Sequence, residues 1–263
     1  MVALLLTLIA HTLADFLFQT HKMVAAKECL KLSGFGTHGG LVFIITAALL
    51  SGYYWPEVLL YSLIITASHL LIDFLKTVLV HNRTSRVELT GFIVDQILHF
   101  LVITLVWQAF DLQADSRITG FYSSLLAPEL VAVFNPGLSR AGLSAEKILA
   151  GILVYLAVCW GGAVLIQKFL KIFTVPLQVK ADSSDCTKVT GKYIGILERA
   201  LILTLVLNNS LTSVVFIFTA KSISRFNELN NRDFAEYYLV GTLFSTALAF
   251  GSGMILGYLC KLT

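Results

Sequence analysis

The stretch VLLYSLIITASHLLIDFLKTVLV, residues 58–80, decides the fold class of this chain. It is almost wholly apolar, yet it contains His69 and, four residues later, Asp73. A run of about 20 apolar residues is long enough to cross the hydrocarbon core of a bilayer as a helix. The segment therefore predicts a transmembrane helix that carries two ionisable side chains inside the membrane.

The composition of the whole chain agrees with this prediction. Of 263 residues, 57% are hydrophobic and only 13% are charged, and the mean hydropathy is +0.81. A soluble domain carries about 25% charged residues. The composition predicts an integral membrane protein surrounded by lipids, and it excludes a disordered chain, a disulfide scaffold and a nucleic-acid partner.

Seven apolar segments predict an all-α polytopic helical bundle with about seven transmembrane helices. They are residues 2–20, 37–55, 58–80, 89–110, 146–170, 193–220 and 236–260. The first lacks the basic start of a signal peptide, so we interpret it as a retained helix. Lysines and arginines gather in residues 21–36, 81–88 and 171–192, which we expect on the cytoplasmic side. This places the N-terminus outside and the C-terminus inside.

The two halves of the chain differ in chemistry. All six histidines lie within the first 99 residues. We expect a four-helix half with a metal site over residues 1–110 and a three-helix half over 146–263. Residues 111–145 are expected to form an extracytoplasmic linker, in which residues 121–134 lie in the membrane interface as a helix.

Three pairs of histidine and aspartate, each four residues apart, fall in the predicted helices. Random placement of six histidines and eight aspartates in this chain would give about 0.4 such pairs, and the sequence contains three. Spacing of four residues puts both side chains on one helix face. The pairs are His11/Asp15, His69/Asp73 and Asp95/His99.

The order within each pair reverses with the direction of its helix. Histidine comes first in the segments 2–20 and 58–80, and aspartate comes first in 89–110, which crosses in the opposite direction. The three carboxylates then lie nearer the cytoplasmic face, with the imidazoles about 6 Å deeper. His38, at the start of the segment 37–55, is a fourth candidate ligand at the rim.

Burial of these histidines and aspartates inside the membrane predicts that they bind a cation. An aspartate in a membrane helix costs about 2.5–3.5 kcal/mol on insertion scales. Imidazole and carboxylate ligands suit zinc, iron or manganese, as one ion or two. We expect His11, His38, His69 and His99 as ligands, and Asp15, Asp73 and Asp95 as ligand, bridge and general base. A proton relay or a buried polar network remains open as an alternative.

Other polar residues of the predicted spans are candidates for substrate binding or for support of the ligands. Gln19 and Lys76 follow two of the histidine-aspartate pairs, Gln96 lies within the third pair, and Glu198 and Arg199 lie near the start of the sixth segment. An arginine such as Arg199 can receive a phosphate. We expect Lys221, Arg225 and Glu236 to form ion pairs between helices, on the side of the membrane opposite the histidines. Asn208 and Asn209 are expected at mid-span, and His21 and His81 in loops.

Several motifs resemble those of an uncharacterised bacterial family of integral membrane proteins of unknown function. The resemblance implies a membrane location and no reaction, and it extends over nearly the whole chain. The motifs are HTLADFLFQ (11–19), SHLLIDFLK (68–76), DQILH (95–99), IGILERALI (194–202), KSISRF (221–226) and AEYYLVGTL (235–243). A weaker similarity, confined to residues 37–38 and 69–73, links the chain to inner-membrane metal-dependent hydrolases.

These observations predict a metal-dependent hydrolase in the bacterial inner membrane that acts on a lipid or lipid-linked phosphoester near the cytoplasmic leaflet. Two alternatives belong to other classes. One is a metal-ion or proton transporter that uses the histidines and aspartates as a relay. The other is a scaffold without catalytic activity, in which the polar residues only pack the helices.

Overall fold

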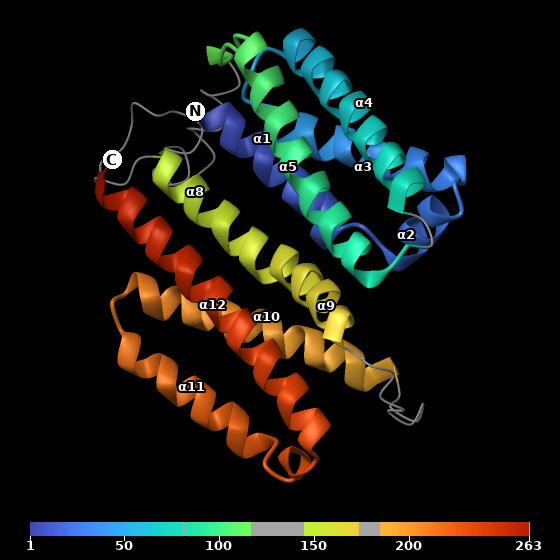
Figure 1. The fold of residues 1–263 in the computed structure, drawn as a ribbon. Coiled ribbons are helices and arrows are strands. Elements are labelled where there is room, and N and C mark those ends of the chain that lie inside the picture. Colours follow the sequence, from blue (N-terminus) through green and yellow to red (C-terminus); the bar gives the residue numbers. More distant parts are fainter. Residues whose placement is uncertain (81–82, 117–144, 174–184, 263) are drawn as a thin grey trace. The chain divides into compact units, whose positions relative to one another are not determined.

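The computed structural model describes residues 1–80, 83–116, 145–173 and 185–262 (Figure 1). These residues form helices joined by turns, with no strand among them. His81 and the expected interfacial helix over 121–134 lie outside the described residues. The chain divides into two compact units, Met1–Leu153 and Val154–Thr263, and we describe each by itself.

The first unit is built on four helices that enclose a common interior. Helix α1 packs against α3 and α5, and α4 packs against the same two helices, so the four form a closed bundle. A fifth, short helix, α2, lies against α3 and α4. The bounds are α1 Val2–Thr12, α2 His21–Glu28, α3 Leu32–Leu49, α4 Trp55–Val80 and α5 Ser85–Ala109.

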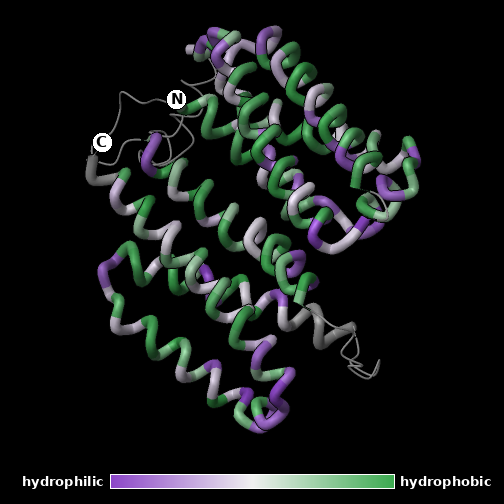
Figure 2. Tube along the Cα trace, in the orientation of Figure 1, coloured by the Kyte–Doolittle hydropathy of each residue, from purple (hydrophilic) through white to green (hydrophobic). Residues whose placement is uncertain are grey.

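The helices of this unit carry apolar side chains outward and polar side chains inward. Ile44, Leu79 and Leu105 are exposed, whereas His38 and Asp95 are fully buried. Figure 2 shows that hydrophobic residues dominate the long helices. This distribution suits a lipid surrounding, in which polar groups must find partners inside the protein. The chain is an integral membrane protein.

Five helices of the described residues are long and apolar enough to cross a membrane, or six if a bent pair counts as one span. This finding confirms an all-α polytopic helical bundle, and the number of about seven spans stays a prediction. The spans are Leu32–Leu49, Trp55–Val80, Ser85–Ala109, Ala145–Phe173 and Arg232–Leu259, and the bent pair is Val2–Leu17 with His21–Glu28.

The bent pair replaces the straight helix expected over residues 2–20. Helix α1 ends in a π-helical turn, Leu13–Leu17, and the chain then turns by 87° into α2. The hydroxyl of Thr20 accepts a hydrogen bond from the backbone N–H of Met23 and caps α2. The basic loop expected over 21–36 is therefore mostly helical, and the break folds α2 back onto the bundle.

Gly34 allows α2 to lie directly on α3. A Cβ atom at this position would meet the Cβ of Ala26 and the backbone N of Lys27, each at 2.8 Å. We therefore expect Gly34→Ala to lower the free energy of unfolding by about 1–3 kcal/mol, as overpacking does elsewhere. Gly36→Ala is the matched control, because nothing lies within 4 Å of its Cβ and the better helix former should stabilise α3. Reversible unfolding in detergent measures both, and equal effects would contradict the expectation.

The second unit corrects the expected helix over residues 193–220. Helix α10 ends at Leu207, and α11 begins only at Leu211. Asn209 adopts a left-handed conformation with φ 56°, which asparagine tolerates better than most residues. Asn208 and Asn209 thus form a turn between two helices, and the prediction of asparagines at mid-span is wrong.

The elements of this unit follow the end of α8, Ala145–Leu156, which contains the boundary between the units. Val158, Ile202, Val206, Val214 and Ala249 form its apolar core. The elements are a π-helical turn Ala157–Gly161, α9 Gly162–Phe173, α10 Asp185–Leu207, α11 Leu211–Ser224, a short 3-10 helix Glu228–Asn230 and α12 Arg232–Leu262.

The turn at Asn209 also moves Lys221 from its expected place. Because α11 folds back along α10 (Figure 1), Lys221 Nζ lies 2.5 Å from a carboxylate oxygen of Glu198. Lys221 therefore lies level with Glu198 and not at the far end of the same span. Arg225 instead pairs locally with Glu228, at 2.7 Å.

Glu236 also pairs within its own helix, because its carboxylate accepts from Arg232 Nε at 3.0 Å. Of the three residues expected in ion pairs between helices, Lys221 alone forms one with a residue that the structure describes.

Candidate metal centre

Four imidazole rings meet in the interior of the first unit, one from each helix of the bundle. The His69 ring centroid lies 4.2 Å from that of His99, 5.0 Å from that of His38 and 5.3 Å from that of His11. All four side chains are buried. The i,i+4 spacing turns each histidine to the same helix face as its aspartate, so burial of that face brings carboxylates to the same place.

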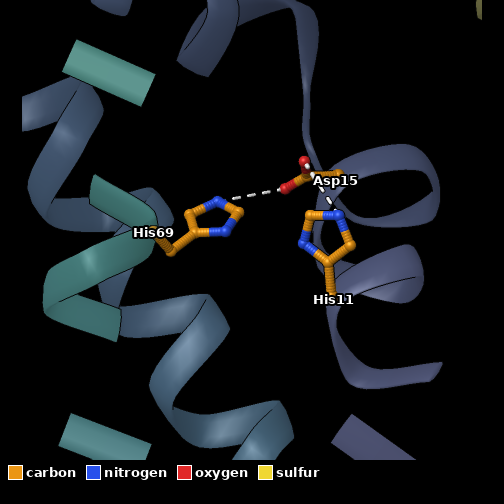
Figure 3. A group of neighbouring side chains, drawn as sticks. All are labelled: His11, Asp15 and His69. Atoms are coloured by element: carbon orange, nitrogen blue, oxygen red, sulfur yellow. Dashed lines mark ion pairs between the residues drawn. The ribbon is translucent and has the colours of Figure 1, made fainter. Parts of the chain in front are cut away.

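Asp15 links the first helix to the others. It lies in the π-helical turn Leu13–Leu17. Its Oδ1 lies 3.2 Å from His38 Nε2 and 3.3 Å from His69 Nε2, and its Oδ2 lies 3.9 Å from His11 Nε2. Figure 3 shows the carboxylate between the rings of His11 and His69.

Asp73 lies against the same two histidines as Asp15. Its Oδ2 lies 3.5 Å from His38 Nε2 and 3.7 Å from His69 Nε2, and these two nitrogens are 2.9 Å apart. With Asp15 Oδ1, the five measured separations run from 2.9 to 3.7 Å. A tetrahedral zinc ion with bonds of about 2.0–2.1 Å needs ligands about 3.3 Å apart. The two nitrogens, together with either carboxylate oxygen, thus have separations close to those of three ligands of such an ion.

Two lysines supply positive charge to the same carboxylates. Lys27 Nζ, from α2, donates to Asp73 Oδ2 at 2.6 Å, and Lys76 Nζ donates to Asp95 Oδ2 at 2.8 Å. Asp15 has no lysine partner among the described residues. With neutral histidines, three carboxylates and two ammonium groups leave one negative charge uncompensated. This excess favours a bound cation.

Lys27 was not among the residues singled out from the sequence. It stands in a basic stretch that looks like a solvated loop. In the structure it is buried, because α2 lies on α3 and α4. Its neighbours Lys22 and Lys31 carry the same charge in the same stretch, so the sequence contains no signal that distinguishes it.

Asp95 and His99 present two further ligand atoms. His99 Nδ1 donates to the backbone carbonyl of Asp95 at 2.8 Å, which leaves Nε2 without a proton when the ring is neutral. That nitrogen and Asp95 Oδ1 are buried, and neither has a hydrogen-bond partner in the described part of the chain. With Asp73, these residues place ligand atoms within 4.8 Å of one another, close enough to hold an ion.

Two glutamines contact the histidines. The Gln19 amide nitrogen lies 3.3 Å from His38 Nδ1, and Gln96 Oε1 lies 3.3 Å from His11 Nε2. An amide oxygen turned toward Nδ1 would hold the proton there and leave Nε2 free to bind metal. Gln96 also donates to Asp95 Oδ2 at 3.1 Å. Both glutamines are thus placed to orient the candidate ligands.

Glu198 and Arg199 lie in the second unit. The Glu198 carboxylate pairs with Lys221. The buried Arg199 guanidinium donates to the carbonyl oxygens of Val158 and Cys159, at 2.9 and 2.6 Å, and to Ser245 Oγ at 3.3 Å. The two carbonyls belong to the π-helical turn, which Arg199 therefore stabilises.

Residues 3–126 match the family model described as "Protein of unknown function (DUF3307)". The match includes every residue of the candidate metal centre, and the motifs in residues 194–243 lie outside it. Curated proteins gave no match to the chain, and neither did solved structures.

Proposed function

We propose that this DUF3307 domain holds a divalent metal ion within the bacterial inner membrane and uses it to hydrolyse a lipid or lipid-linked phosphoester at the cytoplasmic leaflet. His38 Nε2, His69 Nε2, Asp15 and Asp73 are the ligands in this proposal. The observation that carries it is the set of five separations among these four atoms, from 2.9 to 3.7 Å, which are close to the separation of neighbouring ligands of a tetrahedral ion.

The ligand set favours zinc. Two imidazole nitrogens and two carboxylate oxygens suit zinc first, while iron and manganese accept the same donors. A metal ion lowers the pKa of a bound water and generates a nucleophile near neutral pH. Asp95 lies beside the ligand Asp73 and has one free oxygen, so it is the candidate general base.

Lys76 supports an anionic substrate. It binds Asp95, and its side chain is 33% exposed, whereas that of Lys27 is buried. An ammonium group in that position can receive a phosphate oxygen. Because the outer faces of the helices are apolar, a substrate that arrives from the membrane is a lipid or is linked to one.

Metal analysis of the full chain tests the metal centre. We expect a stoichiometric divalent ion in protein purified in detergent, and its loss in Asp15→Asn. This variant is the sharpest one because Asp15 has no lysine partner among the described residues, so its neutralisation strands no buried ammonium group. Asp111→Asn, an exposed position, is the control. Wild-type protein without stoichiometric metal would refute the proposal.

Phosphate release from vesicles that contain phosphatidic acid or a lipid diphosphate tests the reaction. The wild type should release phosphate, and Asp15→Asn should not. Metal binding without release from either lipid would leave the metal centre intact and overturn the hydrolase.

Transport is the second candidate, and the break between α1 and α2 favours it. Interrupted helices form the binding sites of many transporters, and this one turns by 87° beside the ligands. Uptake of zinc into proteoliposomes tests it. Uptake that depends on Asp15, in protein that releases no phosphate, would favour the transporter over the hydrolase.

A further inference from the structure

Helix α2 buries a single side chain against the bundle, and that side chain is charged. Of its eight residues, His21–Glu28, only Lys27 is buried. Its larger apolar residues, Met23 and Val24, are partly exposed. Segments that bury little apolar surface open at a low cost in free energy. The docking of α2 on α3 and α4 therefore depends strongly on what the Lys27 ammonium group binds.

Lys27 binds an oxygen that the proposed metal site also uses. Its Nζ atom lies 2.6 Å from Asp73 Oδ2, and this oxygen lies 3.5 Å from His38 Nε2 and 3.7 Å from His69 Nε2. A metal ion bound to the same oxygen at about 2.0–2.2 Å would lie no more than about 4.8 Å from the ammonium nitrogen. Two cations at this separation repel each other, because little water screens them in a protein interior. Lys27 and the metal ion thus oppose each other at Asp73.

Both ends of α2 are suited to act as hinges. At its start, the chain has turned by 87° relative to the segment Val2–Leu17. After its end, Leu30 has φ 55°, a left-handed conformation that is strained for a bulky residue. Strain of this kind persists only where the surrounding structure enforces it. Release of Lys27 from Asp73 therefore allows α2 to move as a unit while α1 and α3 keep their places.

We propose that α2 is a latch, which Lys27 closes on Asp73 and which a divalent metal ion opens when it binds the same oxygen. In the closed latch, the ammonium group compensates the charge of the Asp73 carboxylate. In the open latch, the metal ion compensates it instead. The proposal rests on the metal site proposed above and adds its regulation: the occupancy of that site sets the position of α2.

Zinc affinity tests the competition at Asp73. Lys27→Met removes the opposing ammonium group, so we expect zinc to bind about tenfold or more tightly than to the wild type, within the usual range for coupled sites. Lys22→Met, in the same helix but exposed, is the matched control and should bind zinc as the wild type does. Titration against a competing chelator measures all three proteins. Equal or weaker affinity in Lys27→Met would overturn the latch alone, whereas a wild type that binds no zinc would refute the metal site and the latch together.

A second variant loosens the latch without a change of charge. An added Cβ atom at Gly34 would come within 2.8 Å of the Ala26 side chain and of the Lys27 backbone. Gly34→Ala should therefore weaken the docking of α2 and raise zinc affinity by about threefold or more, because the open form becomes more populated. Gly36→Ala, whose Cβ atom would meet nothing within 4 Å, should leave the affinity unchanged. Equal zinc affinity in these two variants would contradict an opening of α2.

Hydrogen exchange of the full chain shows whether α2 itself moves. With zinc in excess, the backbone amides of α2 should exchange about tenfold faster or more, because the helix is no longer held on α3. The amides of α11, in the second unit, should keep their rates and serve as the internal control. In Lys27→Met, the amides of α2 should exchange fast with and without zinc. Unchanged or slower exchange of α2 in wild-type protein that binds zinc would overturn the latch and leave the metal site intact.

Discussion

His69→Gln will lower the affinity for zinc by about 100-fold or more, because substitutions of groups that merely support metal ligands already cost 10–100-fold. His69 Nε2 lies within 3.7 Å of three other candidate ligand atoms, from His38, Asp15 and Asp73. Glutamine removes that nitrogen and leaves the charge of the cluster unchanged when the histidine is neutral. Titration of metal-free protein with zinc against a competing chelator measures the affinity.

His21→Gln is the matched control for this substitution. His21 begins α2 at an exposed position and belongs to none of the candidate ligand groups. The same chemical change there should leave zinc affinity at the wild-type value. His38→Gln should match His69→Gln, because the Nε2 atoms of both histidines lie within 3.7 Å of Asp15 Oδ1 and Asp73 Oδ2. Equal zinc affinity in all variants would contradict the assignment of these ligands.

Lys27→Met will lower the free energy of unfolding of metal-free protein by about 3–5 kcal/mol, the typical cost of stranding one member of a buried ion pair. The Lys27 ammonium group donates to Asp73 Oδ2 at 2.6 Å, and both side chains are buried. Reversible unfolding in detergent measures the loss. Added zinc should restore much of it, because the ion takes over the compensation of the Asp73 carboxylate.

A double variant and a surface variant sharpen this result. Lys27→Met/Asp73→Leu removes both charges and should recover stability close to the wild type, since apolar replacement of a buried pair is often neutral or stabilising. Lys22→Met, in the same helix but exposed, should change little. A loss below about 1 kcal/mol in Lys27→Met would mean that water already screens the pair.

The break at residues 208–210 shows where apolar patterning misleads. The segment 193–220 is apolar enough to look like one helix, although Asn208, Asn209 and Ser210 form a typical turn sequence. In the structure this turn prevails, and α11 returns along α10 to pair Lys221 with Glu198. Apolar content sets a preference for the membrane interior, while turn residues decide whether the chain continues across or reverses.

The residues that converge in the first unit were largely visible in the sequence, because the i,i+4 repeat is local and helix geometry converts it into a shared face. For this reason alone, His11 shares a helix face with Asp15, and His69 shares one with Asp73. Gln19 required more, since the chain reaches His38 only after the break that follows α1. The contribution of Lys27 depended wholly on how α2 packs against its neighbours.

The sequence by itself determined the helical membrane class and the pairing of each histidine with its own aspartate, since both follow from composition and from the period of the helix. Only the tertiary structure decided which nitrogens and oxygens lie close together and that Lys27 is buried beside Asp73. Those features depend on contacts between helices, and contacts at long range arise from packing that no local spacing encodes.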